Sequence, residues 1–191
     1  MKFVAFALSF LIGNLLIAQV DTIIVTQHLL PFGYIYPEQE RNPDVVIIHS
    51  SYCSEQKDSF NLQCILDLYK KYDVGAHYII DREGIIFELI DECLIAHHAG
   101  KGTLPDNDNR TNTRSIGIEL INTKNSDYTV AQYLSLAYLL KDIDSRWNIK
   151  YTLGHSDIAA VRKTDPWKFD WNKLKEKKAT FNPTQTYILR L

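Results

Sequence analysis

The distribution of apolar and polar residues along the chain predicts strands that alternate with helices. Residues 45–48 form an all-apolar run, Val-Val-Ile-Ile, which ends in His49 and is typical of a strand buried on both faces. Apolar residues at helical spacing over 59–72 predict a helix that covers one face of a sheet. The same periodicity over 129–147 predicts a longer amphipathic helix, with Thr129 as a candidate cap.

Shorter runs complete the predicted fold. Segments 77–80 and 85–89 should form two strands of a hairpin, because the Glu-Gly pair that ends at Gly84 favours a tight turn. Further strands are predicted at 21–26, 115–121 and 151–153, exposed loops at 100–112 and 154–166, and a closing helix at 171–178 before a tail with a strand-like end. This order favours an α/β or α+β domain with a central mixed sheet flanked by helices, and a site in the loops at strand ends.

The first residues have the pattern of a secretory signal. Lys2 precedes an apolar or small run over 3–17, and Ala18 provides a small residue for cleavage. An uncleaved anchor is the alternative reading, but Gly13 and Asn14 interrupt a run that is shorter than the roughly 20 apolar residues needed to span a bilayer.

This pattern sets the expected domain boundaries and location. We expect a signal peptide at 1–18 and a single domain at 19–191, with a core at about 40–178. The expected location is the periplasm or the medium, with no stable membrane insertion after cleavage of the signal.

Composition limits the classes of function. The chain has 191 residues, of which 46% are apolar and 23% charged, as in an ordinary globular protein. A domain of this size buries enough surface to fold without a structural metal, so any bound metal should serve function. The 21 basic and 23 acidic residues are spread along the chain, which argues against a nucleic-acid partner. We expect a monomer.

Three cysteines leave two readings open. In an oxidising compartment, Cys53 and Cys64 are the pair expected to form a disulfide, with Cys93 left over. Buried apolar thiols are the equally weighted alternative, because free cysteine is among the most buried residue types.

Two histidines and one carboxylate are candidate metal ligands. His49 and His155 each follow a predicted strand, and Asp165 lies ten residues after His155. Such a set suits Zn²⁺ and leaves a fourth position for water or substrate, which is the arrangement of a catalytic site. Isolated His and Asp residues usually have structural roles, so spacing alone leaves that alternative open.

Five segments carry more specific combinations of residues. They are 45–52, 74–80, 96–100, 112–120 and 154–171. The most specific are SIGIEL at 115–120, GHSDIA at 154–159 and RKTDP at 162–166. Together these segments resemble the type-2 N-acetylmuramoyl-L-alanine amidases, the AmpD-like branch of the peptidoglycan recognition protein superfamily, over most of the chain after residue 18.

The resemblance implies an activity and a set of site residues. It implies zinc-dependent hydrolysis of the amide between N-acetylmuramic acid and L-alanine in peptidoglycan or muropeptides, with His49, His155 and Asp165 as zinc ligands. Glu119 would move protons between water and the leaving nitrogen, as a general acid and base does. Lys163 would place a positive charge beside the developing oxyanion, a role selected by the resemblance alone.

The resemblance and the loop positions also give candidate substrate contacts. His98 is carried over as a residue of the substrate cleft, while the neighbouring His97, which replaces a family Trp, is left unassigned. Trp167 is a candidate for stacking on a sugar or peptide, although packing under a loop is the commoner role of a Trp. Asn112 and Arg114 either meet substrate carboxylates and carbonyls or cap their loop.

A non-catalytic peptidoglycan-binding module is the main competing function, because related recognition proteins bind without cutting. Such relatives typically lack a metal ligand, whereas His49, His155 and Asp165 are all present here together with Glu119. A structural envelope protein would explain the first residues but not this set. The enzyme is therefore the preferred interpretation.

Overall fold

A computed structural model describes residues 21–182 and 186–191 as a mixed sheet with helices on both faces. The strand order is β8-β3-β7-β4-β5-β1-β9, and neighbours run parallel except for the antiparallel pair β4–β5. The strands are β1 (Asp21–Gln27), β3 (Val45–Ser51), β4 (Tyr78–Ile80), β5 (Ile86–Glu88), β7 (Ser115–Ile121), β8 (Tyr151–Gly154) and β9 (Thr186–Arg190). A separate antiparallel pair joins β2 (Tyr34–Ile35) and β6 (Ile95–Ala96).

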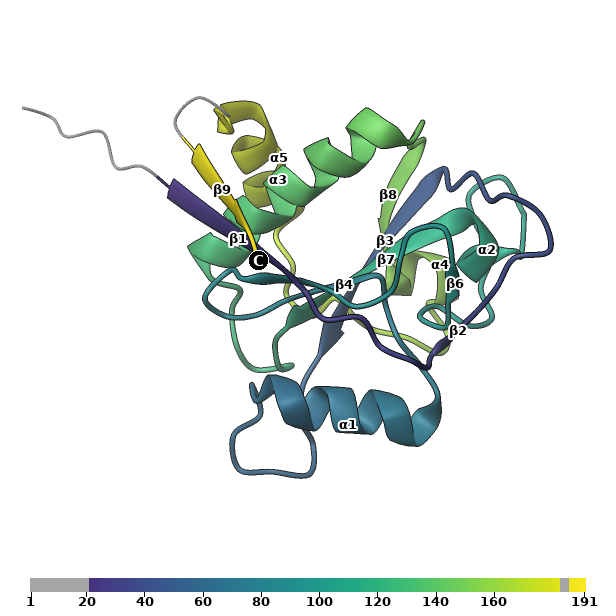
Figure 1. The fold of residues 1–191 in the computed structure, drawn as a ribbon, viewed down its shortest axis with the longest axis horizontal. Helices are drawn as coiled ribbons and strands as arrows, with labels where there is room; N and C mark the ends of the chain where they lie inside the picture. Colours follow the sequence, from purple (N-terminus) through teal and green to yellow (C-terminus); the bar gives the residue numbers. More distant parts are fainter. Residues whose placement is uncertain (1–20, 183–185) are drawn as a thin grey trace, which may run out of the picture.

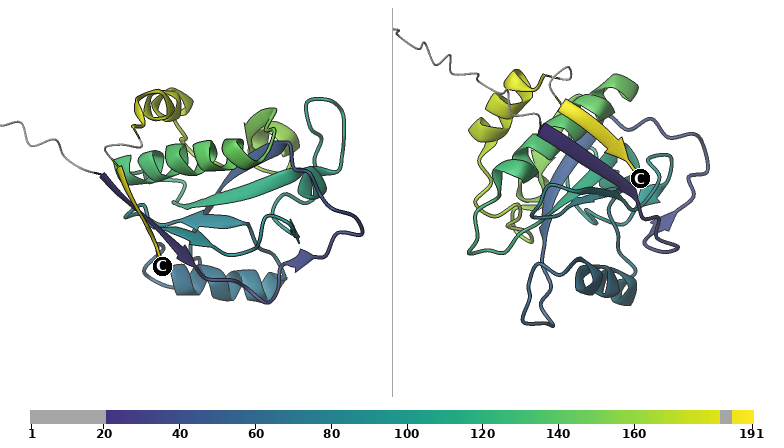
Figure 2. Two further views of the ribbon diagram at one scale, coloured as in Figure 1. Left: turned by 45° about the horizontal axis from the view of Figure 1, so that its top comes forward. Right: turned by 60° about the vertical axis from the view of Figure 1, so that its left-hand side comes forward.

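The long helices lie in two layers. Figures 1 and 2 show α3 and α5 on one face of the sheet and α1 on the opposite face. The helices are α1 (Leu62–Tyr72), α2 (Thr111–Arg114), α3 (Val130–Arg146), α4 (His155–Ala159) and α5 (Trp171–Thr180). This arrangement confirms the predicted central mixed sheet flanked by helices.

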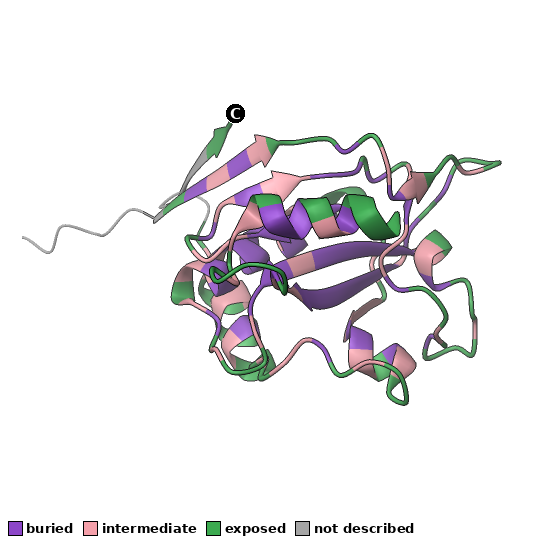
Figure 3. Ribbon diagram, turned by 90° about the horizontal axis from the view of Figure 1, so that it is seen from below, coloured by how far each residue is buried: buried purple, intermediate pink, exposed green. Residues whose placement is uncertain are grey.

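Alternation along β3 decides which side chains reach the site. Ile48 packs in the apolar cluster beneath α3, whereas Ile47 packs with Ile158 of α4. Successive side chains of a strand point to opposite faces, so His49 lies on the same face as Ile47. Figure 3, seen from the α1 side, shows the central strands as the most continuously buried elements.

Local signals explain two elements that the sequence predicted well. Thr129 and Gln132 form a reciprocal capping box at the start of α3, with Oγ1 of Thr129 accepting from Gln132 N at 3.0 Å. In the hairpin, Gly84 has φ +85°, a conformation that favours glycine, and Oδ1 of Asp81 accepts from the backbone N–H of Ile85.

Other sequence predictions need correction or lie outside the described residues. The segments 100–112 and 154–166, expected to be loops, contain the start of α2 and the whole of α4, and the pair β2–β6 was not predicted. The signal peptide expected at 1–18 lies outside the residues described, and the boundaries of the single domain stay a prediction. No helix of the described part is long and apolar enough to span a membrane.

The structure contains the Cys53–Cys64 disulfide, with Cys93 exposed as a free thiol. Cys53 follows β3 and Cys64 lies in the first turn of α1, so the bond ties this helix to the strand that carries His49. This confirms the predicted pairing.

We expect Cys64→Ser to lower the free energy of unfolding by about 3 kcal/mol, because closing a loop of this length restricts the unfolded chain. Urea denaturation measures the change, and Cys93→Ser is the matched control that should leave stability unaltered. Equal stability of all three proteins without reductant would show that the bond contributes nothing.

Candidate metal centre and active site

The three candidate ligands converge on one point, although His49 lies more than 100 residues before His155 and Asp165 in the chain. His49 near the end of β3 and His155 directly after β8 come together because these strands are parallel neighbours. Their Nδ1 atoms are 2.9 Å apart, and Oδ2 of Asp165 lies 3.5 Å from Nδ1 of His49 and 3.2 Å from Nδ1 of His155. All three residues are buried.

The turn after β8 returns Asp165 to the site. The short helix α4 starts at His155, and the backbone N–H of Ser156 donates to the carbonyl of Asp165 at 2.8 Å. The same segment holds Asp157, whose Oδ2 accepts from the N–H of Gly154 at 2.7 Å. Both ends of the segment are thereby fixed at the end of β8.

Hydrogen bonds on the far side of each ring turn both Nδ1 atoms towards Asp165. Nε2 of His155 lies 2.9 Å from the carbonyl oxygen of Ala99, which can only accept, so Nε2 carries the proton of the neutral ring. Nε2 of His49 lies 2.9 Å from Nδ1 of His98. The Nδ1 atom of His155 therefore presents a lone pair to the cluster.

This donor set fits Zn²⁺. Two ligand atoms of a tetrahedral zinc ion with bonds of about 2.0–2.1 Å are roughly 3.3 Å apart, which is close to the three separations observed. Among the residues described, His49, His155 and Asp165 are the group of His, Cys, Asp and Glu side chains that could hold a metal ion.

The protonation states also match those of metal ligands. Burial lowers the pKa of His49 to about 4, so its ring is neutral near pH 7. Burial alone would raise the pKa of Asp165, but hydrogen bonds with His155 and His49 hold it well below its usual range. A neutral imidazole and an ionised carboxylate are the forms that bind a metal.

Glu119 lies beside the ligands without a partner for one oxygen. Glu119 lies on β7 and pairs in register with His49 of the adjacent strand β3, so both side chains lie on one face of the sheet. Its Oε2 atom is buried and makes no hydrogen bond in the described structure. Burial and the charge of Asp165 raise the pKa of Glu119 to about 8, partly offset by Ser51, Lys163 and Tyr69.

Lys163 acts on the same centre through its charge. Its backbone N–H donates to the carbonyl of Ala159 at 2.8 Å, which fixes the residue at the end of α4. The positive charge lowers the pKa of both His49 and Glu119. Lys163 is thus within electrostatic reach of both residues.

The candidate substrate contacts divide into two groups. Trp167 lies two residues after Asp165 in the chain, and its ring packs edge-on against Tyr52 with centroids 5.7 Å apart. Asn112 lies in the short helix α2, and its Oδ1 accepts from the backbone N–H of Ala99 at 2.9 Å. The Asn112 side chain is thus engaged in the capping role that the sequence left open, while Nε1 of Trp167 donates to Oγ1 of Thr164 at 2.9 Å.

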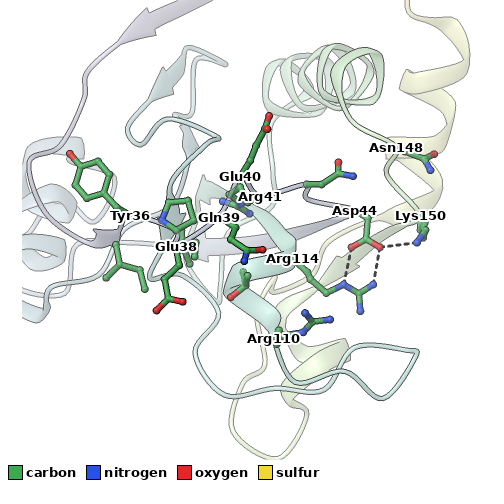
Figure 4. A pocket seen from close by; sticks show the side chains of 15 residues that line it. Tyr36, Glu38, Gln39, Glu40, Arg41, Asp44, Arg110, Arg114, Asn148 and Lys150 are labelled. Atoms are coloured by element: carbon green, nitrogen blue, oxygen red, sulfur yellow. Dashed lines mark hydrogen bonds and ion pairs between the residues drawn. The ribbon is translucent and has the colours of Figure 1, made fainter.

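Arg114 lies at the opposite end of the strands. Its guanidinium pairs with Asp44 at 2.8 Å, Asp106 at 2.7 Å and Asp108 at 3.1 Å. Figure 4 shows it in the wall of a cavity of about 830 Å³, which lies near the starts of β3 and β7 and contains none of the candidate metal ligands. The residue therefore stabilises a loop far from the metal centre.

Comparison with known proteins gives the family. A model of the family described as N-acetylmuramoyl-L-alanine amidase matches residues 39–168. The chain belongs to this family. Among curated relatives, the 1,6-anhydro-N-acetylmuramyl-L-alanine amidase AmpD of Escherichia coli (strain K12) is 42% identical over 105 residues, which are 53% of this chain and 57% of that enzyme. The chain thus spans little more than half the length of the curated relatives it matches.

Solved amidase structures share the fold. A crystal structure of a selenomethionine derivative of AmpD gives a TM-score of 0.71 at 28% identity, covering 80% of this chain and 93% of that one. The Escherichia coli amidase AmiD was solved with the substrate anhydro-N-acetylmuramic acid-L-Ala-D-γ-Glu-L-Lys. It gives a TM-score of 0.60 at 28% identity, covering 73% of this chain and 59% of that one.

The relatives contradict the predicted export to the periplasm or medium. The AmpD homologues, including that of Haemophilus influenzae, are cytoplasmic enzymes of peptidoglycan recycling. The prediction rested on the charge and hydropathy of the first 18 residues, a pattern that reports composition and not processing. We therefore withdraw the prediction that the chain is exported to the periplasm or medium.

Sequence analysis did not identify several residues around the candidate site. Ser51 and Tyr69 bond to one another at 2.6 Å next to Glu119, and Ser115 contacts His98. Hydroxyl groups carry no periodicity that marks them as part of a site. Gly117 did carry a signal, because a glycine within a strand often marks a close approach by another group.

Proposed function

We propose that the chain is a zinc-dependent amidase that cuts between the N-acetylmuramic acid lactyl group and L-alanine in peptidoglycan or muropeptides. Membership of the family supports the choice of the bond that is cut. The names of the relatives favour 1,6-anhydro fragments as the first substrate to test. The observation that carries the proposal is the convergence of His49, His155 and Asp165 beside the unpartnered oxygen of Glu119.

Each residue has a defined task in this proposal. His49, His155 and Asp165 would hold Zn²⁺, which when bound polarises a carbonyl and makes water a nucleophile near neutral pH. In its ionised form, which bound zinc favours, Glu119 takes a proton from the attacking water and passes it to the leaving nitrogen of L-alanine. Lys163 stabilises the negative charge that develops on the carbonyl oxygen.

Mass spectrometry of purified muropeptides after incubation with the zinc-loaded protein tests this function. The expected products are a peptide with a free L-alanine amine and a sugar with a free lactyl carboxylate, together one water heavier than the substrate. Chelation of zinc should stop the reaction and added Zn²⁺ should restore it. Substrate that is bound but recovered intact would favour the alternative, a non-catalytic peptidoglycan-binding module.

Lys163→Ala should lower kcat and kcat/KM together by roughly 10²- to 10³-fold if its charge acts like one oxyanion donor, with zinc still bound. Lys175→Ala, on the exposed face of α5, is the control that should keep normal kinetics. Steady-state rates with parallel zinc analysis decide between three roles. A change confined to KM would make Lys163 a substrate anchor, and normal rates would make it a solvated side chain.

A further inference from the structure

The ring of His98 lies directly over Gly117 in the middle of β7. A Cβ atom at position 117 would come within 2.4 Å of Cγ and 2.5 Å of Nδ1 of His98, closer than real Cβ contacts. Ser115, Gly117 and Glu119 share one face of β7 because side chains alternate along a strand. His98 therefore occupies a place that only glycine provides, between Ser115 and the metal centre.

The hydrogen bonds through His98 have a defined direction. They begin at the carbonyl of Thr111, which can only accept, so the hydroxyl of Ser115 donates to it at 2.5 Å. The Ser115 oxygen then has only lone pairs left for Nε2 of His98 at 3.2 Å, and Nε2 must carry the proton. The neutral ring of His98 consequently has an accepting Nδ1.

The same direction continues to the metal centre. Nδ1 of His98 accepts from Nε2 of His49 at 2.9 Å, so the proton of His49 is on Nε2. Its Nδ1 atom is left with a lone pair, pointing at His155 and Asp165. The result is two imidazole lone pairs 2.9 Å apart next to a carboxylate, an arrangement that a cation between them would stabilise.

We propose that His98 is a positioning residue that fixes the tautomer and ring orientation of His49 for zinc binding through Nδ1, and that it does not bind substrate through its ring nitrogens. Both nitrogens are already engaged, one by Ser115 and one by His49. The inference rests on the proposed zinc site and replaces the substrate-cleft role expected for His98. His155 has a backbone carbonyl in the corresponding position, so each histidine ligand has its own acceptor.

Partners of this kind orient metal ligands, and their loss typically weakens metal affinity by about 10- to 100-fold. His98→Leu removes the acceptor, whereas His98→Asn can place its Oδ1 where Nδ1 was. Competition with a fluorescent zinc chelator should therefore show a Kd for Zn²⁺ raised roughly 10- to 100-fold in His98→Leu and largely restored in His98→Asn.

Two further variants separate positioning from packing. Gly117→Ala displaces the ring without removing it, so it should also raise the Kd for Zn²⁺. His97→Ala is the matched control, because the adjacent ring contacts the carbonyl of Asp73 instead of the metal centre and its loss should leave the Kd unchanged. Circular dichroism of each zinc-free variant checks that the fold is kept.

Nitrogen-15 NMR of the unaltered protein tests the same point without any substitution. We expect His49 to carry its proton on Nε2 and to bind zinc through Nδ1. A proton on Nδ1 of His49 would overturn the proposal, as would unaltered zinc affinity in His98→Leu combined with a raised KM, which would return His98 to substrate binding. Failure of the unaltered protein to bind Zn²⁺ would instead overturn the metal site itself.

Discussion

Glu119→Gln should lose most hydrolysis while it keeps its zinc. A general acid and base of this kind contributes about 10²- to 10⁴-fold to the rate, and the amide cannot accept the proton of the attacking water. The ligands His49, His155 and Asp165 are untouched, so zinc content should stay at one ion per chain. Initial rates of L-alanine-peptide release and metal analysis of the same sample measure the two effects.

The same substitution should stabilise the zinc-free fold at high pH. The pKa of Glu119 is raised from about 4.5 to about 8, so the folded state is penalised when this carboxyl is ionised. Stability from this group is fully present below about pH 4.5 and is lost as pH rises to about 8. Gln cannot ionise and avoids that loss.

The difference in melting temperature between Glu119→Gln and the unaltered protein should therefore grow from pH 5 to pH 9 in the presence of a chelator. Bound zinc favours the ionised carboxylate, so the difference should shrink when zinc is added. Unchanged turnover in Glu119→Gln would assign proton transfer to another group. A pH-independent difference in melting temperature would show that folding does not raise the pKa of Glu119.

His155→Ala should lose both zinc and all measurable hydrolysis. His155 is 2% exposed and supplies one of three ligand atoms, and the remaining His49 and Asp165 cannot enclose the ion. Metal analysis after gel filtration and the muropeptide assay measure the two losses. His97→Ala provides a histidine control outside the centre.

A loss of the folded structure must be excluded as the cause of the lost zinc and activity. His155→Ala also leaves the carbonyl of Ala99 without the imidazole donor, so circular dichroism and melting curves should accompany the assay. Stoichiometric zinc with full activity in His155→Ala would remove the metal centre from the mechanism.

The elements with strong local signals were predictable from sequence. The run of β-branched residues before His49, the glycine at the hairpin turn and the capping box at Thr129 each define their element within a few neighbouring residues. The short helices α2 and α4 and the pair β2–β6 were not predicted. Elements of two to five residues are too short for the periodicity of apolar residues to repeat. Tertiary contacts determine them instead.

The ligand set could be proposed from sequence because His49 and His155 follow predicted strands and Asp165 lies ten residues after His155, and the resemblance implied the same three residues. Its geometry could not, since the sequence does not state that β3 and β8 are neighbours. The positioning role that we propose for His98 could not be inferred for a related reason. Which ring nitrogen carries the proton depends on the hydroxyl of Ser115, and that contact exists only in the folded chain.

The strands β1 and β9 lie side by side at one edge of the sheet, as Figure 2 shows, and both fall outside the range 39–168 that matches the family. A chain shortened to that range would leave the backbone groups of β5 unpaired along an open edge. Exposed edges of this kind recruit strands from other molecules and cause aggregation. Insolubility of such a fragment would therefore report a missing edge cover, and it would carry no information about the metal centre.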